Sequence, residues 1–460
     1  MPIRLWWNIG IGSCGSGLNT SRRLWRLKAD EFSSWSQARS RTTWCKTWSK
    51  SLRRFARGCT GGVPLVTAPS ALWRFSSVKI HRAYRYELAP NRMQRVMLAK
   101  HAGVARFAYN WGLARRIALH EEAGQSTNAI EQHRELNRLK KTDFPWMYEV
   151  SKCAPQEALR DLDRAFQHFF RGLNEGRKVG FPRFKKKGRD DSFRLTGSIR
   201  VLDNAVQLPR LGRIRLKEKP YVEGRILSAT VKREADRWYV SLATETEIPD
   251  PVPPSGEPVG VDLGVSWFLT LSDGTKIKAP KPLRRYLRRL ERLSKRHSRK
   301  KPGSRNRRKS ALALARLHRK IRNIRQDFLH KVTTELAKTK RAIVMEDLHV
   351  RGMVQNRALA RAISDMGFGE FRRMLTYKCA WYGSELIIAP RFYASSKTCS
   401  ACGYVISELP LSVREWTCPA CSTRHDRDIN AAKNLLRIGT ASSAGSDACG
   451  DPSGGAALGC

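Results

Sequence analysis

A regular alternation of apolar and polar residues marks the first clear element of the chain. From Val78 to Leu88 every second residue belongs to one face, which is the period of a half-buried β-strand. Asn91 follows Pro90 and can cap a helix, and residues 92–175 have mostly helical periodicity. The clearest helix is predicted over 155–173, where seven apolar side chains form one stripe suited to core packing.

The period changes to that of short strands after residue 192. Residues 226–231 and 238–242 are rich in β-branched and aromatic side chains, which favour strands. We expect these strands and the strand at Val78 to form one small β-barrel whose sequence is interrupted by the helices. The proline-rich segment 249–258 then predicts a domain boundary.

Beyond this boundary strand and helix patterns alternate, which predicts an α/β domain. Residues 259–271 indicate two strands joined by a turn, and 341–348 and 384–389 indicate two more. Between them, residues 281–325 predict a strongly basic pair of helices.

The charge of the chain restricts its function more than its length does. The 460 residues contain 87 Lys and Arg against 40 Asp and Glu, a net charge of +47. Such a charge repels itself unless a polyanion neutralises it, which favours nucleic acid as the partner and disfavours an ordinary metabolic enzyme. A membrane surface is the alternative polyanion. We expect no membrane, because no apolar run approaches the roughly 20 residues that a spanning helix needs.

The positive charge is concentrated in two segments. Residues 281–325 hold 20 Lys and Arg against one acid, Glu291, and a second basic run leads out of the predicted helices at 183–187. A charged run is ordinarily a solvated face, but this many unbalanced cations favour contact with phosphates. The candidate nucleic-acid contacts are Arg183, Lys185, Lys186, Lys187, Arg299, Lys300, Arg307 and Arg308.

Residues 1–77 differ from the rest of the chain. They contain seven of the 13 Trp and 13 Lys and Arg against two acids, and neither helical nor strand periodicity persists in them. Three interpretations are open: a basic arm that orders on nucleic acid, a small packed domain, or a non-coding stretch translated from a mis-assigned start. The composition favours the last of these.

Four of the 11 cysteines form two tight pairs, and the others are scattered. Cys399 pairs with Cys402 and Cys418 with Cys421, a spacing that places four thiolates around one tetrahedral Zn²⁺. Such a closed site has no open position, so its predicted role is structural. His425 could replace one ligand, although four thiolates suffice. The scattered cysteines argue against a disulfide framework and favour an intracellular protein. The expected location is the cytoplasm, in association with the nucleoid.

Three acids stand where an apolar strand ends or a helix begins. Asp262 lies within Val-Gly-Val-Asp-Leu-Gly-Val, Glu346 ends an apolar strand, and Asp428 begins a helix, with Asp426 as the alternative third acid. Each has a structural alternative, a buried salt bridge for the first two and a helix cap for Asp428. Together they indicate a carboxylate cluster that binds two divalent ions for phosphodiester hydrolysis. Mg²⁺ suits such an all-carboxylate site.

These motifs occur in an order that is similar to one protein family. In chain order they are Tyr-Arg-Tyr at 84–86, Phe-Pro-Arg-Phe-Lys at 181–185, Gly-Val-Asp-Leu-Gly at 260–264, Met-Glu-Asp-Leu at 345–348, Ser-Ser-Lys-Thr-Cys-Ser at 395–400, Cys-Pro at 418–419, and His-Asp-Arg-Asp at 425–428 followed by Asn430 and Asn434. The chain resembles TnpB proteins, also called OrfB, the RNA-guided nucleases of bacterial and archaeal insertion sequences and relatives of type V CRISPR effectors. The resemblance covers about residues 78–437.

The resemblance implies a fold, a site and partners. The implied fold is multidomain α/β: an RNase H-like (RuvC) nuclease domain with an inserted zinc ribbon, and a small wedge-like β-barrel interrupted by a helical recognition lobe. Asp262, Glu346 and Asp428 match the catalytic carboxylates, which would hold two Mg²⁺ or Mn²⁺ ions, and the four cysteines match the ligands of a structural Zn²⁺. The implied partners are a guide RNA from the transposon end, target double-stranded DNA and a transposition partner enzyme.

Two other functions stay open: a zinc-ribbon regulator of transposition that binds nucleic acid without cutting it, and a strand-joining transposase. The nuclease is favoured because a decayed site would have lost an acid and all three are present. The expected domains are an extension at 1–77, the wedge-like barrel at 78–91 and 185–250, the recognition lobe at 92–184, the RuvC domain at 256–394 with its basic helical pair at 281–325, the zinc ribbon at 395–424, the last RuvC segment at 425–438 and a disordered tail at 439–460.

Overall fold

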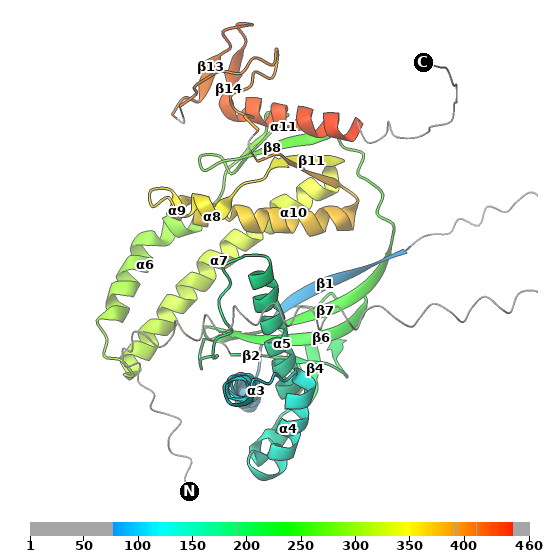
Figure 1. Cartoon of the computed structure of the whole chain (residues 1–460), viewed down its shortest axis with the longest axis vertical. Coiled ribbons are helices and arrows are strands. Elements are labelled where there is room, and N and C mark those ends of the chain that lie inside the picture. Colours follow the sequence, from blue (N-terminus) through cyan, green and yellow to red (C-terminus); the bar gives the residue numbers. More distant parts are fainter. Residues whose placement is uncertain (1–76, 190, 392, 411, 445–460) are drawn as a thin grey trace, which may run out of the picture. The chain divides into compact units, whose positions relative to one another are not determined.

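The computed structural model describes residues 77–189, 191–391, 393–410 and 412–444 (Figure 1). The predictions for the N-terminal extension and for most of the tail fall outside these residues. The described chain divides into two compact units. The first, mainly helical, comprises Pro90–Ile199 and Gln207–Ile214, and the second contains most of the strands and the whole described chain from Arg215 onward.

Helices build the first unit. The apolar stripe predicted within 155–173 is buried: Leu159 and Leu162 are fully inaccessible to solvent, as is Leu113 on the neighbouring helix. Gly112 allows the two helices to approach closely, because a Cβ at this position would lie 2.6 Å from Leu159 Cδ2. The elements of this unit are α3 (Arg92–Ala123), α4 (Ala129–Thr142), the 3₁₀ helix η1 (Pro145–Glu149), α5 (Cys153–Asn174) and the strand β2 (Ser192–Leu195).

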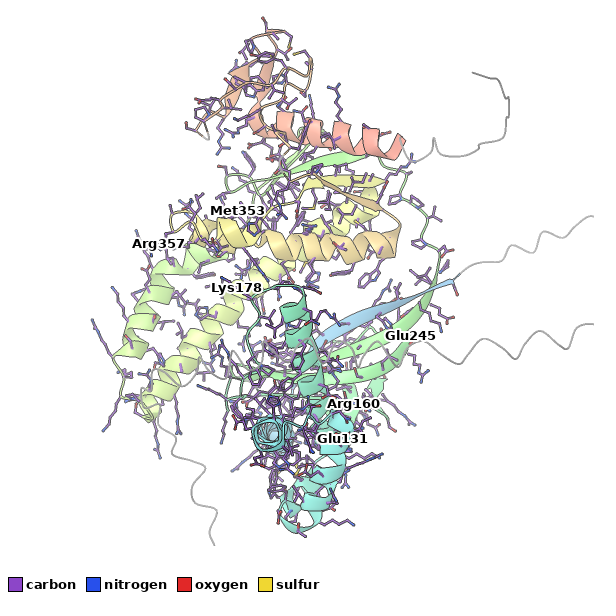
Figure 2. The ribbon with its side chains drawn as sticks, viewed as in Figure 1. Glu131, Arg160, Lys178, Glu245, Met353 and Arg357 are labelled. Carbon is purple, nitrogen blue, oxygen red and sulfur yellow. The ribbon has the colours of Figure 1, made fainter. Side chains whose placement is uncertain are left out.

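Capping boxes begin two of these helices. At the start of α3 the Asn91 side chain accepts a hydrogen bond from the Gln94 N–H at 2.8 Å, and the Gln94 side chain accepts one from the Asn91 N–H at 3.0 Å. Asn128 and Glu131 repeat this arrangement at the start of α4, where Figure 2 labels Glu131. Each box satisfies backbone donors that a helix N-terminus leaves without partners. The cap predicted at Asn91 is therefore confirmed.

An antiparallel sheet opens the second unit. All 12 residues of β1 (Ser77–Leu88) pair with β7 (Arg237–Pro249), whose other edge pairs with β6 (Arg225–Glu234). Ile80 and Leu88 are buried on one face of β1, as the alternation predicts. Closure into a barrel stays a prediction. A separate three-stranded sheet consists of β3 (Arg200–Leu202), β4 (Ala205–Leu208) and β5 (Gly212–Arg215).

A five-stranded mixed sheet follows in the same unit (Figure 1). Its order is β10 (Lys276–Ile277), β9 (Leu269–Leu271), β8 (Val259–Leu263), β11 (Ala342–Glu346) and β12 (Glu385–Ala389). The strand β9 is antiparallel to both of its neighbours, β10 and β8, whereas β8, β11 and β12 are parallel. The α/β prediction for this half of the chain is thus confirmed.

Helices cover both faces of this sheet (Figure 1). Alternate side chains of a strand point to opposite faces. Ile343 of β11 belongs to the core that contains α7 (Arg305–Thr339) and α10 (Phe368–Tyr382). The next residue, Val344, packs instead in the cluster that contains side chains of α11 (Arg427–Ala444). The sheet therefore separates α11 from the other two helices.

Two glycines bring α11 close to the sheet. A Cβ on Gly260 of β8 would lie 1.9 Å from the Ala432 carbonyl oxygen, and one on Gly439 would lie 2.3 Å from Val344 Cγ2. This close packing explains a correction to the prediction of a disordered tail from 439, because α11 continues to Ala444. Gly439, one of the small residues that indicated disorder, allows the helix to lie against Val344 of β11.

The basic helical pair is longer than predicted. It consists of α6 (Pro282–Ser298) and α7, which does not end near Arg325 but continues to Thr339. Leu329, Val332 and Leu336 are buried in this extension and anchor it in the core beneath the sheet. No helix among the described residues is long and apolar enough to cross a membrane. The remaining elements are α8 (Val350–Met353), α9 (Ala360–Met366), β13 (Glu415–Thr417) and β14 (Arg424–Asp426).

Candidate metal centres

The three predicted acids come from three neighbouring elements. Asp262 follows three buried residues of β8, and Glu346 ends β11, one position beyond the Met345–Val261 pair that joins these parallel strands. The two carboxylates therefore lie at the same edge of the sheet. Asp428 comes from the first turn of α11, the helix that packs against β8.

The charges of these acids act on one another. The pKa of Asp262 is raised to about 8, first by loss of hydration and then by the negative charges of Glu346 and Asp428, while Arg427 and Arg414 oppose the shift. A carboxylate that is desolvated and repelled by two others is stabilised when a divalent cation binds among them. The donor set, three carboxylates without a histidine or cysteine, fits Mg²⁺ or Mn²⁺.

The carboxylate of the alternative third acid, Asp426, is bonded to groups of the protein itself. Its carboxylate accepts hydrogen bonds from the N–H groups of Asp428 and Ile429, both at 3.1 Å, and so caps α11. It also accepts a hydrogen bond from Lys276 Nζ at 2.6 Å. Although burial opposes the shift, these contacts lower the pKa of Asp426. The cap weighed for Asp428 therefore belongs to Asp426. Asp428 forms an ion pair with Arg414 at 3.4 Å, and its assignment as the third acid of the cluster stays a prediction.

The acid next to Glu346 is also held by protein groups. Asp347 accepts hydrogen bonds from Arg372 and Arg391, and these contacts lower its pKa. Glu346 itself accepts a hydrogen bond from the Ser395 hydroxyl at 2.5 Å. Ser395 was not predicted as a site residue, and the one signal in the sequence was its place just before the first cysteine pair.

The four predicted cysteines gather at one point. Their sulfur atoms all lie within 4.8 Å of one another, and the Cys399–Cys421 and Cys402–Cys418 sulfurs are 3.6 Å apart. A tetrahedral Zn²⁺ with bonds of about 2.3 Å requires sulfur–sulfur distances of about 3.8 Å. The residues present therefore fit a Cys₄ zinc centre.

His425, the alternative zinc ligand, approaches one of these sulfurs. Its Nε2 lies 3.0 Å from Cys399 Sγ, and its ring packs against Trp416 with centroids 4.9 Å apart. A group placed in this way can hydrogen-bond to a metal-bound thiolate and orient it. With four sulfurs already around the centre, this contact gives His425 a supporting position beside Cys399.

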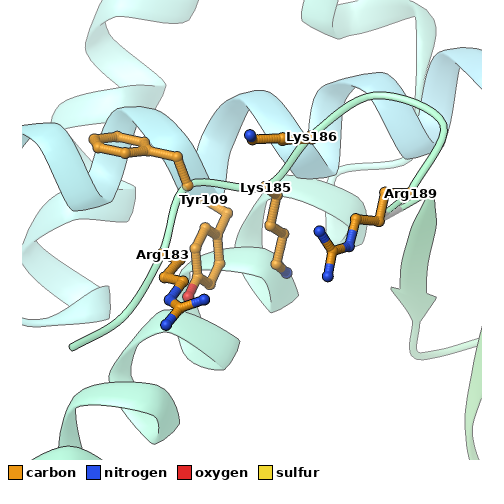
Figure 3. Close-up of a pocket in the computed structure, with 6 residues that line it drawn as sticks. Tyr109, Arg183, Lys185, Lys186 and Arg189 are labelled. Atoms are coloured by element: carbon orange, nitrogen blue, oxygen red, sulfur yellow. The ribbon is translucent and has the colours of Figure 1, made fainter. Parts of the chain in front are cut away.

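The basic run at 183–187 lines a pocket in the first unit (Figure 3). The pocket has a volume of about 550 Å³. It is lined by Tyr109, Arg183, Phe184, Lys185, Lys186 and Arg189. Lys185 Nζ lies 3.9 Å from the centre of the Tyr109 ring, and the Asn110 side chain holds the Lys185 backbone through two hydrogen bonds of 2.8 and 3.0 Å. Lys187 does not line the pocket, whereas Tyr109, Phe184 and Arg189 were not predicted.

The four candidate contacts near the turn between α6 and α7 differ in their surroundings. Arg299, Lys300 and Arg308 are exposed, but Arg307 donates a hydrogen bond to the Lys300 carbonyl at 2.6 Å and so closes the turn. Further along α7, Arg316 and Arg319 bind Asp236 of the β6–β7 hairpin at 2.8 and 3.0 Å. Although burial opposes the shift, these bonds lower the pKa of Asp236 to about 2. Some arginines of the basic helical pair are therefore bound to an acid of the β6–β7 hairpin.

Three family profiles match the chain. The OrfB profile of the IS605 group, described as "Probable transposase", matches residues 241–357. A Cas12f1-like TNB domain matches 368–435, which includes the four cysteines. A profile described as a helix-turn-helix domain matches 80–125, where the structure has the strand β1 and the single long helix α3.

Relatives match over most of the chain. A protein of Streptomyces pristinaespiralis named "Putative RNA-guided DNA endonuclease" is 39% identical over 81% of this chain and 92% of its own length. Another with this description, InsQ of Escherichia coli K12, is 34% identical over 78% and 92%. The structure of a Cas12f1-sgRNA-target DNA complex covers 78% of this chain and 99% of its own, at 14% identity and a TM-score of 0.48. The extent and identity of the two sequence matches show that the chain belongs to the TnpB family of transposon-encoded proteins, also called OrfB.

Proposed function

We propose that this protein is an RNA-guided DNA endonuclease that cuts target DNA by metal-dependent phosphodiester hydrolysis. The observation that supports the proposal is the placement of Asp262 and Glu346 at the same end of two paired parallel strands, with Asp428 in the first turn of the helix packed against β8. The negative charges of Glu346 and Asp428 also raise the pKa of Asp262, after loss of hydration. The strand order of the sheet, an antiparallel meander joined to two further parallel strands, supports its interpretation as an RuvC-type nuclease core. The names of the sequence relatives point to the same activity.

Each part of the site has a distinct task in this proposal. Asp262, Glu346 and Asp428 would hold two Mg²⁺ or Mn²⁺ ions, which supply an activated water and stabilise the leaving oxygen when they are bound. The parallel strands fix two of the carboxylates relative to each other, and α11 fixes the third. The cysteine cluster, as a closed structural zinc site, would hold the ribbon that leads into α11.

We further propose that the pocket at Arg183 binds RNA or DNA through both a base and a phosphate. Phe184 lies beside four cationic side chains and has 51% of its surface exposed. Exposure of an apolar aromatic ring to water does not stabilise the fold, so the ring is available to a ligand. Nucleobases stack on such rings, and each cation near a phosphate releases counterions. The two contributions differ in their dependence on salt, so they can be separated by experiment.

The pocket predicts two kinds of loss. We expect Phe184→Ala to weaken RNA binding by about tenfold without changing the slope of log affinity against log salt, because stacking involves no counterion. We expect Arg183→Ala to reduce this slope by about one unit. Filter binding over a range of salt concentrations measures both. Lys141→Ala, an exposed lysine at the end of α4, is the control. A stacking role is wrong if Phe184→Ala binds RNA as tightly as the parent.

Cutting with a reprogrammed guide tests the proposed function directly. The protein is expressed with RNA from its own transposon end, the RNA that copurifies is sequenced, and its guide segment is replaced. We expect cleavage of duplex DNA that matches the guide only when Mg²⁺ or Mn²⁺ is present, and none with a mismatched guide. Binding without cleavage would instead indicate the regulator, and joined strands would indicate the transposase.

A further inference from the structure

Residues 393–398, just before the first cysteine pair, reach Glu346 through Ser395. Within this segment Ser395 is only 5% exposed, and its hydroxyl donates the 2.5 Å hydrogen bond to Glu346 Oε1. Pairing of Glu346 with Ala389 fixes the backbone of this acid but leaves its carboxylate free to rotate. The Ser395 hydroxyl removes that freedom, as the outer partners of metal ligands do.

Two asparagines of α11 hold this segment in place. The Asn434 amide donates hydrogen bonds to the carbonyl oxygens of Ser395 at 2.8 Å and Thr398 at 2.6 Å. The Asn430 amide donates to the same Thr398 oxygen at 2.7 Å and accepts a hydrogen bond from the Ser400 N–H at 2.9 Å. These partners fix the orientation of both amides, since the reverse orientation would place oxygen against oxygen.

Asparagine is an unusual choice for these positions. It is a weak helix former, because its side chain competes for backbone groups, yet both residues are 1% exposed and lie one turn apart on α11. A buried amide costs free energy where it is not bonded. The NH₂ groups of both residues and Asn430 Oδ1 are bonded to the segment that carries Ser395 or to the residue after Cys399, whereas Asn434 Oδ1 has no partner among the described residues. Packing alone would favour leucine or alanine.

We propose that Ser395 is a positioning residue for Glu346, and that Asn430 and Asn434 form a clamp that transmits the order of the zinc ribbon to the nuclease site. The clamp connects the second acid, the cysteine cluster and the third acid. Ser395 bonds to Glu346, Ser400 adjoins Cys399, and α11 carries Asp428. This inference rests on the proposed function only in assigning metal binding to the acids.

The test measures Mn²⁺ binding by the protein without RNA or DNA, using electron paramagnetic resonance. We expect Ser395→Ala to weaken Mn²⁺ binding by about tenfold or more. Ser395→Thr, which keeps the hydroxyl, should bind close to the parent value, and so should Ser396→Ala, the adjacent matched control. Asp262→Ala defines the background. Equal Mn²⁺ affinity in Ser395→Ala and the parent overturns the inference.

A double-mutant cycle separates positioning from simple stabilisation. If Asn434 acts through Ser395, Asn434→Ala should weaken Mn²⁺ binding, and combining it with Ser395→Ala should add little to the loss from either change. Zinc content should stay at one ion per chain, because every ligand is intact. Fully additive losses, or an Asn434→Ala variant that loses thermal stability but keeps its Mn²⁺ affinity, would contradict the clamp.

Failure of the proposed function gives a different result from failure of this inference. A parent protein that binds Mn²⁺ in a Ser395-dependent way but cuts no DNA supports the positioning and contradicts the endonuclease. A parent that cuts DNA at the same Mg²⁺ concentration as Ser395→Ala supports the endonuclease and contradicts the positioning.

Discussion

Asp262→Ala should abolish DNA cutting while RNA and DNA binding persist. The substitution removes the carboxylate that both neighbouring acids influence, and with it a ligand of the metal that would stabilise the charge of the transition state. A loss of about 4 kcal/mol of this stabilisation lowers the rate about a thousandfold. Cleavage of a guide-matched duplex by the purified ribonucleoprotein measures the effect.

A matched control is available on the same sheet. Asp273 is an exposed acid in the turn between β9 and β10, and Asp273→Asn should cut as the parent does. Gel-shift assays with both variants should give parental affinities for the matched duplex. Undiminished cutting by Asp262→Ala would mean that the active site lies elsewhere.

The same residue predicts how the stability of the protein depends on pH without Mg²⁺ or Mn²⁺. Its pKa rises from 3.8 to about 8 on folding. Between these values the folded state holds a proton that the unfolded chain releases, so stability falls as the pH rises through this window. Asp262→Asn has no carboxyl group to titrate at this position. Its free energy of unfolding should therefore fall less than that of the parent between about pH 5 and pH 8. Thermal unfolding of both proteins measures the difference, and parallel curves would contradict the assignment.

Cys402→Ser should remove the zinc and with it the order of the ribbon. Cys402 is exposed, so the change to serine disturbs little packing, and its effect reports the missing thiolate. Structural zinc contributes on the order of 10 kcal/mol to folding in zinc-dependent peptides. We therefore expect residues 395–426 to unfold below the melting temperature of the remaining protein and to become sensitive to proteases.

Zinc content and limited proteolysis measure this loss together. Cys153→Ala, a buried free cysteine of the helical unit, should keep one zinc per chain and is the control. Cutting should fall as well, because the ribbon leads into α11 and Asp428. A Cys402→Ser protein that retains its full zinc content would refute the ligand assignment.

Local patterns predicted the parts of the structure that depend on neighbouring residues. The alternation around Val78, the Asn91 cap and the acids that end β8 and β11 all follow from sequence within a few positions. Arg316 and Asp236 are 80 residues apart in sequence, and their pairing depends on the fold of the β6–β7 hairpin, which no local signal gives. The basic run therefore overstated the surface available to phosphates.

The limits of prediction at the site have the same origin. Asp426 and Asp428 are both aspartates at the start of the same helix, and only the helix geometry shows that Asp426 is the cap, which leaves Asp428 as the proposed third acid. The length of α7 and the continuation of α11 to Ala444 depend on tertiary packing that outweighs local composition. Ser395 had no signal beyond its place just before the first cysteine pair, and that place alone does not assign a role to a serine.

The chain order of the carboxylates also determines when the site can exist during synthesis. Asp262 and Glu346 lie on β8 and β11, whereas Asp428 lies on α11, which follows every other described element. A ribosome makes the N-terminal elements first, so the basic helices emerge before the third acid does. Under the proposed function, a chain still being synthesised has its basic helices but lacks the third carboxylate, so it would be unable to cut the DNA from which it is being expressed.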